Sequence, residues 1–375
     1  MTTVRLLKNG IEAFPVMFDA IERAERSINV EMFIYANDRT GNELLDRLVS
    51  AARRRVVVKV MIDAVGSWSL PEDYWTRLTD AGGVVRRFRP VTFGMFLLRD
   101  HRKLVLVDDQ IVYVGGMNVA DEYFRGKGIE PAWRDNMLEI AGPEAVRVRI
   151  SFDRMWGRAE TPLRKAVFRA VRRHSPSVLE DGRIRFLESG PEYTTQQVRR
   201  AYRMVINSSR GRIDLAMGYF YPHGGILRAL KHAVLRGVRV RLLFPQHSDV
   251  ALARWAARGL YGRLLRAGME VWEYRPSMLH AKLAIIDDIV IAGSANLDIR
   301  SDRINAELVA VVTDPDLASR ARTDFEQDLK QAEQIQLQEW KARPRCQQIK
   351  ERISYLLLAR ADVFFARAEM ARMIR

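Results

Sequence analysis

Apolar residues along the chain recur at two spacings, one typical of helices and the other of strands. Ile11–Arg26 carries apolar side chains three and four residues apart, which predicts an amphipathic helix. Val56–Ile62 is rich in β-branched residues and predicts a buried strand. The same criteria predict the other elements of the first half: helices Asn42–Arg53 and Pro143–Trp156, a helix ending at Ala81–Gly83, and strands Ile28–Ile34, Val84–Phe88 and Met137–Ile140.

The second half of the chain repeats this order of elements. Its predicted elements are the helices Thr194–Ser208, Gly225–Arg236 and Ala251–Arg266 and the strands Ile213–Met217, Val238–Phe244 and Leu308–Val312. Two segments align residue for residue, Arg55–Val60 with Arg236–Arg241 and Ala81–Pro90 with Ala267–Pro276. The repeat predicts an internal duplication in which each copy is an α/β sandwich.

One polar pattern occurs once in each copy. The first copy contains His101, Lys103, Asp108, Gly115 and Asn118. The pattern returns 179 residues later, at His280, Lys282, Asp287, Gly293 and Asn296. A single match of this kind is weak, but two matches, each with a trailing Gly-x-x-Asn, disfavour the alternative of two ordinary buried strands.

The residue types in this pattern indicate a chemistry. A His and a Lys two residues apart on a strand project to the same side. Imidazole acts as a nucleophile or a proton carrier near neutral pH, and an ammonium group binds phosphate oxygens. The pattern therefore predicts phosphoryl transfer without evident metal ligands. Two half-sites of this kind are expected to meet at the interface between the copies.

Composition and charge limit the number of domains and the class of binding partner. The chain has 375 residues, 48% of them hydrophobic, enough for one large or two medium domains. A net charge of +15 favours polyanionic partners, either nucleic acid or anionic lipid. Cys346 is the only cysteine, which excludes an intrachain disulfide and a cysteine metal site. No segment approaches the ~18 apolar residues of a membrane span, so we expect any action on membranes to occur at their surface.

The paired motifs resemble those of the phospholipase D superfamily, and in particular those of bacterial cardiolipin synthases with two motifs. Further supporting segments are Asp63–Ser67, Trp133–Asp135, Tyr219–Pro222, Met278–Lys282 and Gly293–Asp298. The resemblance implies an α/β fold of two tandem, pseudo-symmetric α-β-α sandwich domains with the active site at their interface. It also implies transfer of a phosphatidyl group from one phosphatidylglycerol to another through a phosphohistidine, with release of glycerol and no metal or cofactor.

The resemblance assigns roles to the motif residues. His101 is expected to be the nucleophile and His280 the general acid and base, although the symmetry of the motifs leaves this choice open. Lys103 and Lys282 are expected to neutralise the phosphate oxygens.

Further residues are expected to support them. The resemblance implies that Asp135 and Glu307, at matching places just before two strands, bond the catalytic histidines and orient them. Asn118, Asn296 and Ser294 are expected to bind the phosphate oxygens.

The last residue of each motif stands apart. Asp108 and Asp287 complete the catalytic motifs, but their positions at strand ends predict a bracing role rather than a chemical one. Five residues separate Asp287 from Gly293, whereas six separate Asp108 from Gly115. This shorter second hairpin leaves the placement of the following Ser and Asn open.

The domain boundaries follow from the repeat. We expect a first half at 1–160, a basic amphipathic linker at 161–180, a second half at 181–335 and a basic amphipathic tail at 336–375. An apolar insertion at 91–98 is either an acyl-chain groove or membrane-contacting lip, or an ordinary hydrophobic loop. The linker and tail either lie on anionic lipid or pack on the protein.

These features predict phosphatidylglycerol and a membrane surface as partners, on the cytoplasmic side of the bacterial inner membrane. Neither nucleic acid nor an obligate protein partner is expected. The motifs also fit a phospholipase D-type hydrolase, another phosphatidyltransferase, a nuclease or an inactive membrane-binding scaffold. The apolar insertion argues against a nuclease, and two intact His-Lys pairs argue against an inactive protein.

Overall fold

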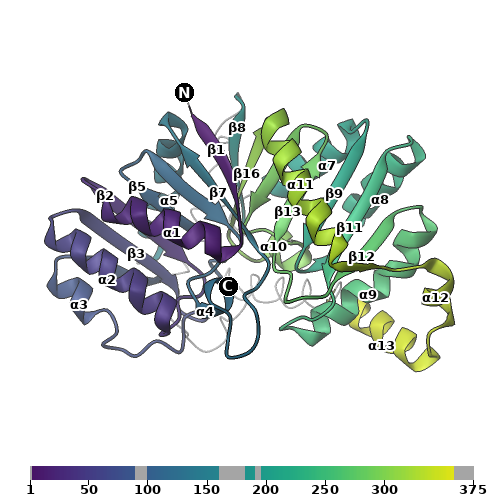
Figure 1. The fold of residues 1–375 in the computed structure, drawn as a ribbon, viewed down its shortest axis with the longest axis horizontal. Coiled ribbons are helices and arrows are strands. Elements are labelled where there is room, and N and C mark those ends of the chain that lie inside the picture. The colour runs from purple at the N-terminus through teal and green to yellow at the C-terminus, as the bar shows by residue number, and fades with distance from the viewer. Residues whose placement is uncertain (1, 89–98, 160–181, 191–195, 359–375) are drawn as a thin grey trace, which may run out of the picture.

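Two mixed β-sheets form the framework of the molecule and lie side by side, one in each half of the chain (Figure 1). The computed structural model describes residues 2–88, 99–159, 182–190 and 196–358. Within these ranges the first sheet has seven strands in the order β1-β7-β6-β5-β2-β3-β4. These strands are β1 (Thr3–Lys8), β2 (Ser27–Met32), β3 (Val57–Asp63), β4 (Val84–Phe88), β5 (Lys103–Val107), β6 (Ile111–Gly115) and β7 (Asn136–Ala141).

The second sheet repeats the first. Its order over the described residues is β17-β12-β11-β9-β13-β14-β16-β8, which is the first order read from the other end with β17 added at one edge. The predicted duplication is therefore confirmed. The strands are β8 (Ile184–Ser189), β9 (Arg212–Met217), β11 (Arg239–Pro245), β12 (Glu270–Tyr274), β13 (Lys282–Ile286), β14 (Ile289–Gly293), β16 (Glu307–Thr313) and β17 (Ala332–Gln334).

Helices cover the outer face of each sheet and enclose a separate apolar core there. Those against the first sheet are α1 (Asn9–Glu22), α2 (Arg39–Arg53) and α3 (Thr76–Asp80). Those against the second sheet are α7 (Gln197–Ser208), α8 (Gly224–Leu235) and α9 (Ala251–Arg266). Alternate residues of each buried strand face the opposite side, where a third core begins.

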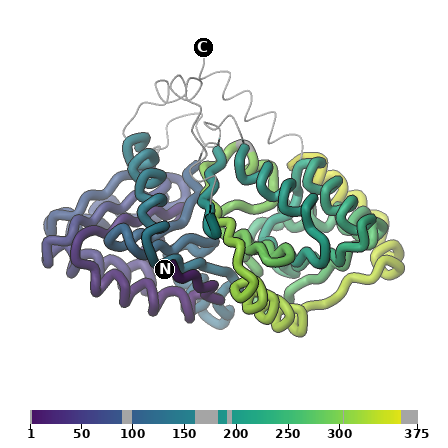
Figure 2. Tube along the Cα trace, turned by 90° about the horizontal axis from the view of Figure 1, so that it is seen from above, coloured from purple at the N-terminus to yellow at the C-terminus, as the bar shows by residue number. Residues whose placement is uncertain are grey.

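This third core joins the two halves. It takes Phe152 from α5 (Val146–Ala159) and Phe325 from α11 (Pro315–Lys330), together with Leu104 of β5 and Leu283 of β13. One continuous apolar cluster therefore spans both sheets, and Figure 2 shows the halves next to each other from above. Burial of this layer holds the halves in a fixed relation, which a site shared between them requires.

A buried charged side chain adds a polar tie across the same interface. Arg102, between the His and Lys of the first motif, points away from them into the protein. Its guanidinium lies 3.0 Å from Glu31 and donates to Ser151 at 2.7 Å. The same group lies 3.7 Å from Glu188 on β8 of the second half. A buried cation needs such partners, because one left without them would strongly destabilise the fold.

The predicted elements mostly agree with the structure. Strand Val84–Phe88 and helix Ala251–Arg266 have the predicted bounds. The helix predicted from Pro143 instead begins with a 3₁₀ turn, Pro143–Ala145, before α5. The helix predicted to reach Arg26 ends at Glu22, because the apolar spacing stops at Ile21 and only polar residues and one alanine follow. The apolar insertion at 91–98 and the linker helix at 162–173 lie outside the described residues.

The C-terminal segment packs against α9 as two helices, α12 (Leu337–Ala342) and α13 (Arg345–Leu356). Glu351 of α13 is buried and pairs with Arg258 at 3.1 Å and with Arg343 at 2.9 Å. No helix among the described residues has the length and apolar character of a membrane span. The remaining short elements are α4 (Asp121–Phe124), α10 (Ile299–Arg303), β10 (Phe220–Tyr221) and β15 (Leu297–Asp298).

Candidate active site

The two motifs meet where the halves pair their backbones. Lys103 and Lys282 are the first residues of β5 and β13, and each histidine lies two residues earlier. His101 N–H donates to Ala306 O at 3.0 Å, and His280 N–H donates to Arg134 O at 2.8 Å. Each motif is thereby bonded to the residue before a carboxylate of the other half.

Each histidine is paired with the acid of the opposite half. Nδ1 of His101 lies 3.0 Å from Oε1 of Glu307, and Nδ1 of His280 lies 2.7 Å from Oδ2 of Asp135. A carboxylate accepts a hydrogen bond from Nδ1–H, which makes Nε2 the reactive position of each ring. Nε2 of His280 also lies 3.0 Å from Lys282 Nζ. The sequence indicated both acids but not this exchange between halves.

The two lysines are buried beside the histidines. Lys103 Nζ donates to His101 O at 2.6 Å, and Lys282 Nζ lies 2.7 Å from Nδ1 of His280. Burial lowers the pKa of Lys103 to about 7 and also lowers that of Lys282. Two ammonium groups in a buried place favour binding of an anion that neutralises them, and a phosphodiester is such an anion.

The histidines differ in their electrostatic surroundings. Burial lowers the pKa of His101 well below its usual value, and the charges of Lys103 and Lys282 lower it further. Burial and Lys282 also lower the pKa of His280, but Asp135 acts in the opposite direction. Burial raises the pKa of Glu307 to about 7. The His101 ring is therefore held neutral, with an unprotonated Nε2.

Ser294 does not face the phosphate position that was expected for it. Its hydroxyl donates to Oε2 of Glu307 at 2.5 Å and accepts from the N–H of Leu308 at 3.0 Å. The residue is fully buried and orients Glu307. The corresponding Gly116 leaves no room for a side chain, since a Cβ there would lie 2.3 Å from Asp135 Oδ1.

The shorter second hairpin leaves the strand register unchanged. Gly115 pairs with Met137, and Gly293 pairs with Val309, each two residues after the acid. Asn118 and Asn296 both line the cleft. The amide of Asn118 donates to Tyr123 Oη at 2.8 Å, whereas Oδ1 of Asn296 is buried without a hydrogen-bond partner in the described chain.

Asp108 and Asp287 lie at the far ends of β5 and β13 from the lysines, about 16 Å away at the rise of a strand. Asp108 accepts backbone N–H groups of Glu25, Arg26 and Ser27 at 2.7–3.0 Å. Asp287 does the same with three successive residues from Arg210. These contacts fit the bracing role, and a part for Asp108 and Asp287 in the catalysis stays a prediction.

Both histidines open into one cleft of about 770 Å³. Aromatic rings surround His280: Tyr123, Trp133 and Tyr219 have centroids 5.4, 5.6 and 6.0 Å from it. The ring of Phe33 lies 4.8 Å from that of His101. Aromatic rings thus lie next to both histidines, and the lining also contains charged residues, among them Arg99, Glu122 and Arg300.

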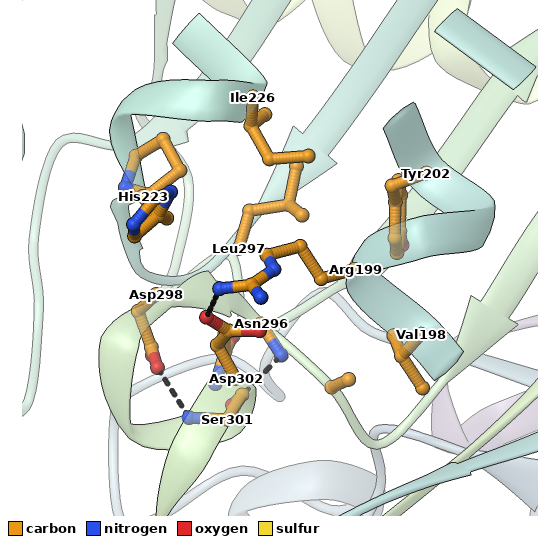
Figure 3. Close-up of a pocket in the computed structure, with 12 residues that line it drawn as sticks. Val198, Arg199, Tyr202, His223, Ile226, Asn296, Leu297, Asp298, Ser301 and Asp302 are labelled. Carbon is orange, nitrogen blue, oxygen red and sulfur yellow. Dashed lines mark hydrogen bonds and ion pairs between the residues drawn. The ribbon is translucent and has the colours of Figure 1, made fainter. Parts of the chain in front are cut away.

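A smaller pocket of about 20 Å³ adjoins one wall of this cleft, and Figure 3 shows the residues that line it. Asn296 and Asp298 line both spaces. Arg199 donates to Asp302 at 2.8 Å, and Asp298 accepts the N–H of Ser301 at 2.7 Å. These two contacts hold the segment that separates the pocket from the cleft in place. In the described chain, no group of three or more His, Cys, Asp or Glu residues is arranged to hold a metal ion.

Sequence reasoning missed the aromatic residues and Asp249 in the cleft. Trp133 and Tyr219 lie in segments that supported the resemblance, but nothing in their spacing indicated contact with a histidine. Phe33 lies in a loop and Tyr123 in the four-residue helix α4, and neither carries a local pattern. A cleft between two halves collects residues from many loops, so periodicity within one element cannot reveal them.

Comparisons with known proteins agree with this geometry. The family model described as "Cardiolipin synthase, PLD-like domain" matches residues 17–156 and 202–329. A cardiolipin synthase of a Geobacillus species is 34% identical over 367 residues, covering 95% of this chain and 72% of its own length. The major cardiolipin synthase of Bacillus subtilis is 32% identical over 365 residues, covering 95% of this chain and 74% of its own.

Solved structures show the fold. The phosphatidylserine synthase of Haemophilus influenzae superposes with a TM-score of 0.73 at 15% identity, covering 99% of this chain and 95% of its own. The polyphosphate kinase of Porphyromonas gingivalis gives a TM-score of 0.61, also at 15% identity, and is covered over 53% of its length.

Proposed function

The chain belongs to the phospholipase D-like cardiolipin synthase family, and we propose that it transfers a phosphatidyl group from one phosphatidylglycerol to another, releasing glycerol. The observation that carries the proposal is the pair of histidines in one cleft, each bonded at Nδ1 to a carboxylate of the other half. Two imidazoles oriented through Nδ1 and two ammonium groups match the needs of a double displacement at phosphorus.

In the first step, Nε2 of His101 attacks the phosphorus of a bound phosphatidylglycerol. A P–N bond forms and the bond from phosphorus to the glycerol oxygen breaks. The leaving oxygen takes a proton from Nε2 of His280, so neutral glycerol departs. Lys103 and Lys282 offset the charge on the non-bridging oxygens, and Glu307 stabilises the cationic phospho-imidazole.

In the second step, the terminal hydroxyl of another phosphatidylglycerol enters the position that glycerol left. Nε2 of His280, now unprotonated, removes the hydroxyl proton while the oxygen attacks phosphorus. The P–N bond breaks and its electron pair returns to His101. Cardiolipin is released and both histidines regain their starting protonation states.

The surroundings of the rings support His101 as the nucleophile. Its lowered pKa keeps the ring neutral, as a nucleophile requires. His280 has Asp135 bonded to Nδ1, and the charge of Asp249 also acts on it. Negative charges on that side favour the protonated ring, which the acid step needs.

Incubation with phosphatidylglycerol vesicles followed by lipid mass spectrometry tests the proposal. Cardiolipin and glycerol are expected from the unaltered protein, and neither from His101→Ala or His280→Ala. His232→Ala is the matched control, since this exposed histidine lies on α8 outside the cleft. Phosphatidic acid as the sole product would instead assign a hydrolase.

The C-terminal helix supports a peripheral position at an anionic membrane, which we propose to be the cytoplasmic face of the inner membrane. Ile349, Ile353 and Leu357 recur along α13 and its end at 50–58% exposure. A groove of about 730 Å³ between α9 and α13 is lined by seven cationic side chains, from Arg258, Arg263, Arg266, Lys341, Arg343, Arg345 and Arg352. Exposed apolar residues beside cations are typical of helices that lie in an anionic lipid interface.

A further inference from the structure

We propose that Asp249 and Tyr219 form a polyol-binding subsite beside His280, which holds the vicinal hydroxyls of the leaving glycerol and of the incoming glycerol headgroup. This inference rests on the proposed function and names the groups that select its alcohol. It concerns residues to which the two motifs give no role.

The placement of the two side chains carries the argument. Asp249 lies four residues after the end of β11, and Tyr219 two residues after the end of β9. Tyr219 Oη donates to Asp249 Oδ1 at 2.6 Å, and the Tyr219 ring lies edge-on to the His280 ring at 6.0 Å. Both residues line the cleft. The Asp249 carboxylate is therefore connected through the Tyr219 side chain to His280, the proposed general acid.

The two ends of the cleft differ in charge. The charge of Asp249 acts on both His280 and Lys282, whereas that of Arg300 acts on His101. A phosphate is attracted to the lysines and to the His101 end. A neutral alcohol is not repelled by a carboxylate, and its hydroxyls donate hydrogen bonds that a carboxylate accepts.

The subsite breaks the symmetry of the duplication. Pairing of Ser27 with Val57 and of Arg212 with Arg239 aligns Val57 of β3 with Arg239 of β11. This alignment corrects the sequence match of Arg55–Val60 with Arg236–Arg241 by one residue. Four residues after β3 the first half has Ser67, whose buried hydroxyl donates to Phe33 O at 3.1 Å. The first half therefore has no carboxylate at this position. A double displacement needs such a difference, because the alcohol must bind opposite the nucleophile and not beside it.

An alkylammonium headgroup is the competing ligand, because carboxylates and aromatic rings also bind cations. Two observations favour the polyol. Lys282 lies against His280 and repels a second cation in the same place. The rings of Tyr123 and Trp133 pack on each other at 5.0 Å and on His280, so they do not form an open cage.

Competition between two matched alcohols tests the subsite. The protein is supplied with phosphatidylglycerol and equal concentrations of 1,2-propanediol and 1-propanol, which differ by one vicinal hydroxyl. Mass spectrometry then gives the ratio of phosphatidylpropanediol to phosphatidylpropanol. We expect the unaltered protein to prefer the diol and Asp249→Asn to lower that preference about tenfold, equivalent to about 1.4 kcal/mol. Tyr219→Phe should lower it about threefold, because the carboxylate loses one of its anchors.

Asp288→Asn is the charge-matched control. It removes an exposed carboxylate from the turn after β13, at the end remote from the cleft, and should leave the ratio unchanged. An unchanged ratio in Asp249→Asn, with transfer intact, would overturn the subsite alone. Ethanolamine is offered as acceptor in a parallel reaction. Loss of transfer to ethanolamine alone in Asp249→Asn would overturn the polyol subsite in favour of an ammonium site. Absence of any transfer product in the unaltered protein would refute the proposed function and the subsite with it.

Discussion

Replacing Glu307 with Gln tests the division of labour between the two histidines. Glu307 is fully buried and lies 3.0 and 3.2 Å from Nδ1 of His101 through its two oxygens. Gln keeps the shape and can still accept the Nδ1–H, while its amide can donate to Ser294. Ser294 then has Leu308 O, at 3.3 Å, as an alternative acceptor. The substitution therefore removes a charge and little else.

The expected cost can be worked from this geometry. Phosphorylation of His101 at Nε2 leaves a cation about 3 Å from the Glu307 carboxylate. At an effective dielectric constant of about 20 their attraction is about 5.5 kcal/mol. A neutral hydrogen bond to Gln recovers about 1.5 kcal/mol, leaving about 4 kcal/mol. Formation of the phosphohistidine should therefore slow about 10³-fold.

The assay uses a p-nitrophenyl phosphodiester, because p-nitrophenolate departs without a proton. A burst of p-nitrophenolate then reports attack by His101 and bypasses the acid step. Glu307→Gln should slow the burst about 10³-fold. Asp135→Asn, at the matching position of the other half, should leave the burst within a few-fold of the unaltered rate. With phosphatidylglycerol as donor, both variants should be slow.

Two outcomes would refute the reasoning. A normal burst in Glu307→Gln, with loss of the burst in Asp135→Asn, would make His280 the nucleophile. Equal effects of the two variants on the burst would show that the histidines do not differ in role. Circular dichroism and unfolding curves of both variants would confirm that each retains the fold.

Four further outcomes follow from the contacts. Asp108→Ala removes the acceptor of three backbone N–H groups and should lower the free energy of unfolding by about 1–3 kcal/mol with kcat unchanged; a large loss of kcat would contradict its bracing role. Burial acts to raise the pKa of Asp108, but those hydrogen bonds act in the other direction and the pKa is lowered. The difference in free energy of unfolding between the unaltered protein and Asp108→Ala should therefore narrow as pH falls below about 4, as measured by urea unfolding. Lys103→Met should abolish transfer yet raise the unfolding midpoint at pH 6, because burial lowers the Lys103 pKa to about 7, and the gain should shrink as pH approaches about 10.4 in thermal scans. Ile353→Ser with Leu357→Ser should weaken sedimentation with phosphatidylglycerol vesicles, whereas Ile11→Ser should not, although Ile11 on α1 is more exposed than either residue.

The sequence predicted the fold well where hydrophobic periodicity is strong. The repeated order of helices and strands predicted both sheets, and the aligned segments predicted the duplication. It did not predict β1 or β8, which contain charged residues among their apolar ones. Both lie at the end of a sheet, where pairing with β7 and β16 rather than their own composition specifies a strand.

The site was predicted only in part, for a related reason. Spacing within a strand indicated His101, Lys103 and their partners in the second copy. It could not indicate that Ser294 turns toward Glu307, because that depends on the neighbouring strand β16. It also could not indicate Asp249 or the aromatic residues, which come from α4 and from loops of both halves and meet only after the two sheets pack.

The exchange of acids between the halves follows from the register of the backbone across the interface. Asp100 pairs in parallel with Ala306, and Leu279 pairs in parallel with Arg134. The next residue on each strand is a histidine on one side and an acid on the other. Neighbouring residues of paired strands project to the same face, so each histidine must meet the acid of the other half. A slip of one residue would turn the acid away. The interface register is therefore as necessary to the chemistry as the motifs, and no pattern within one half contains it.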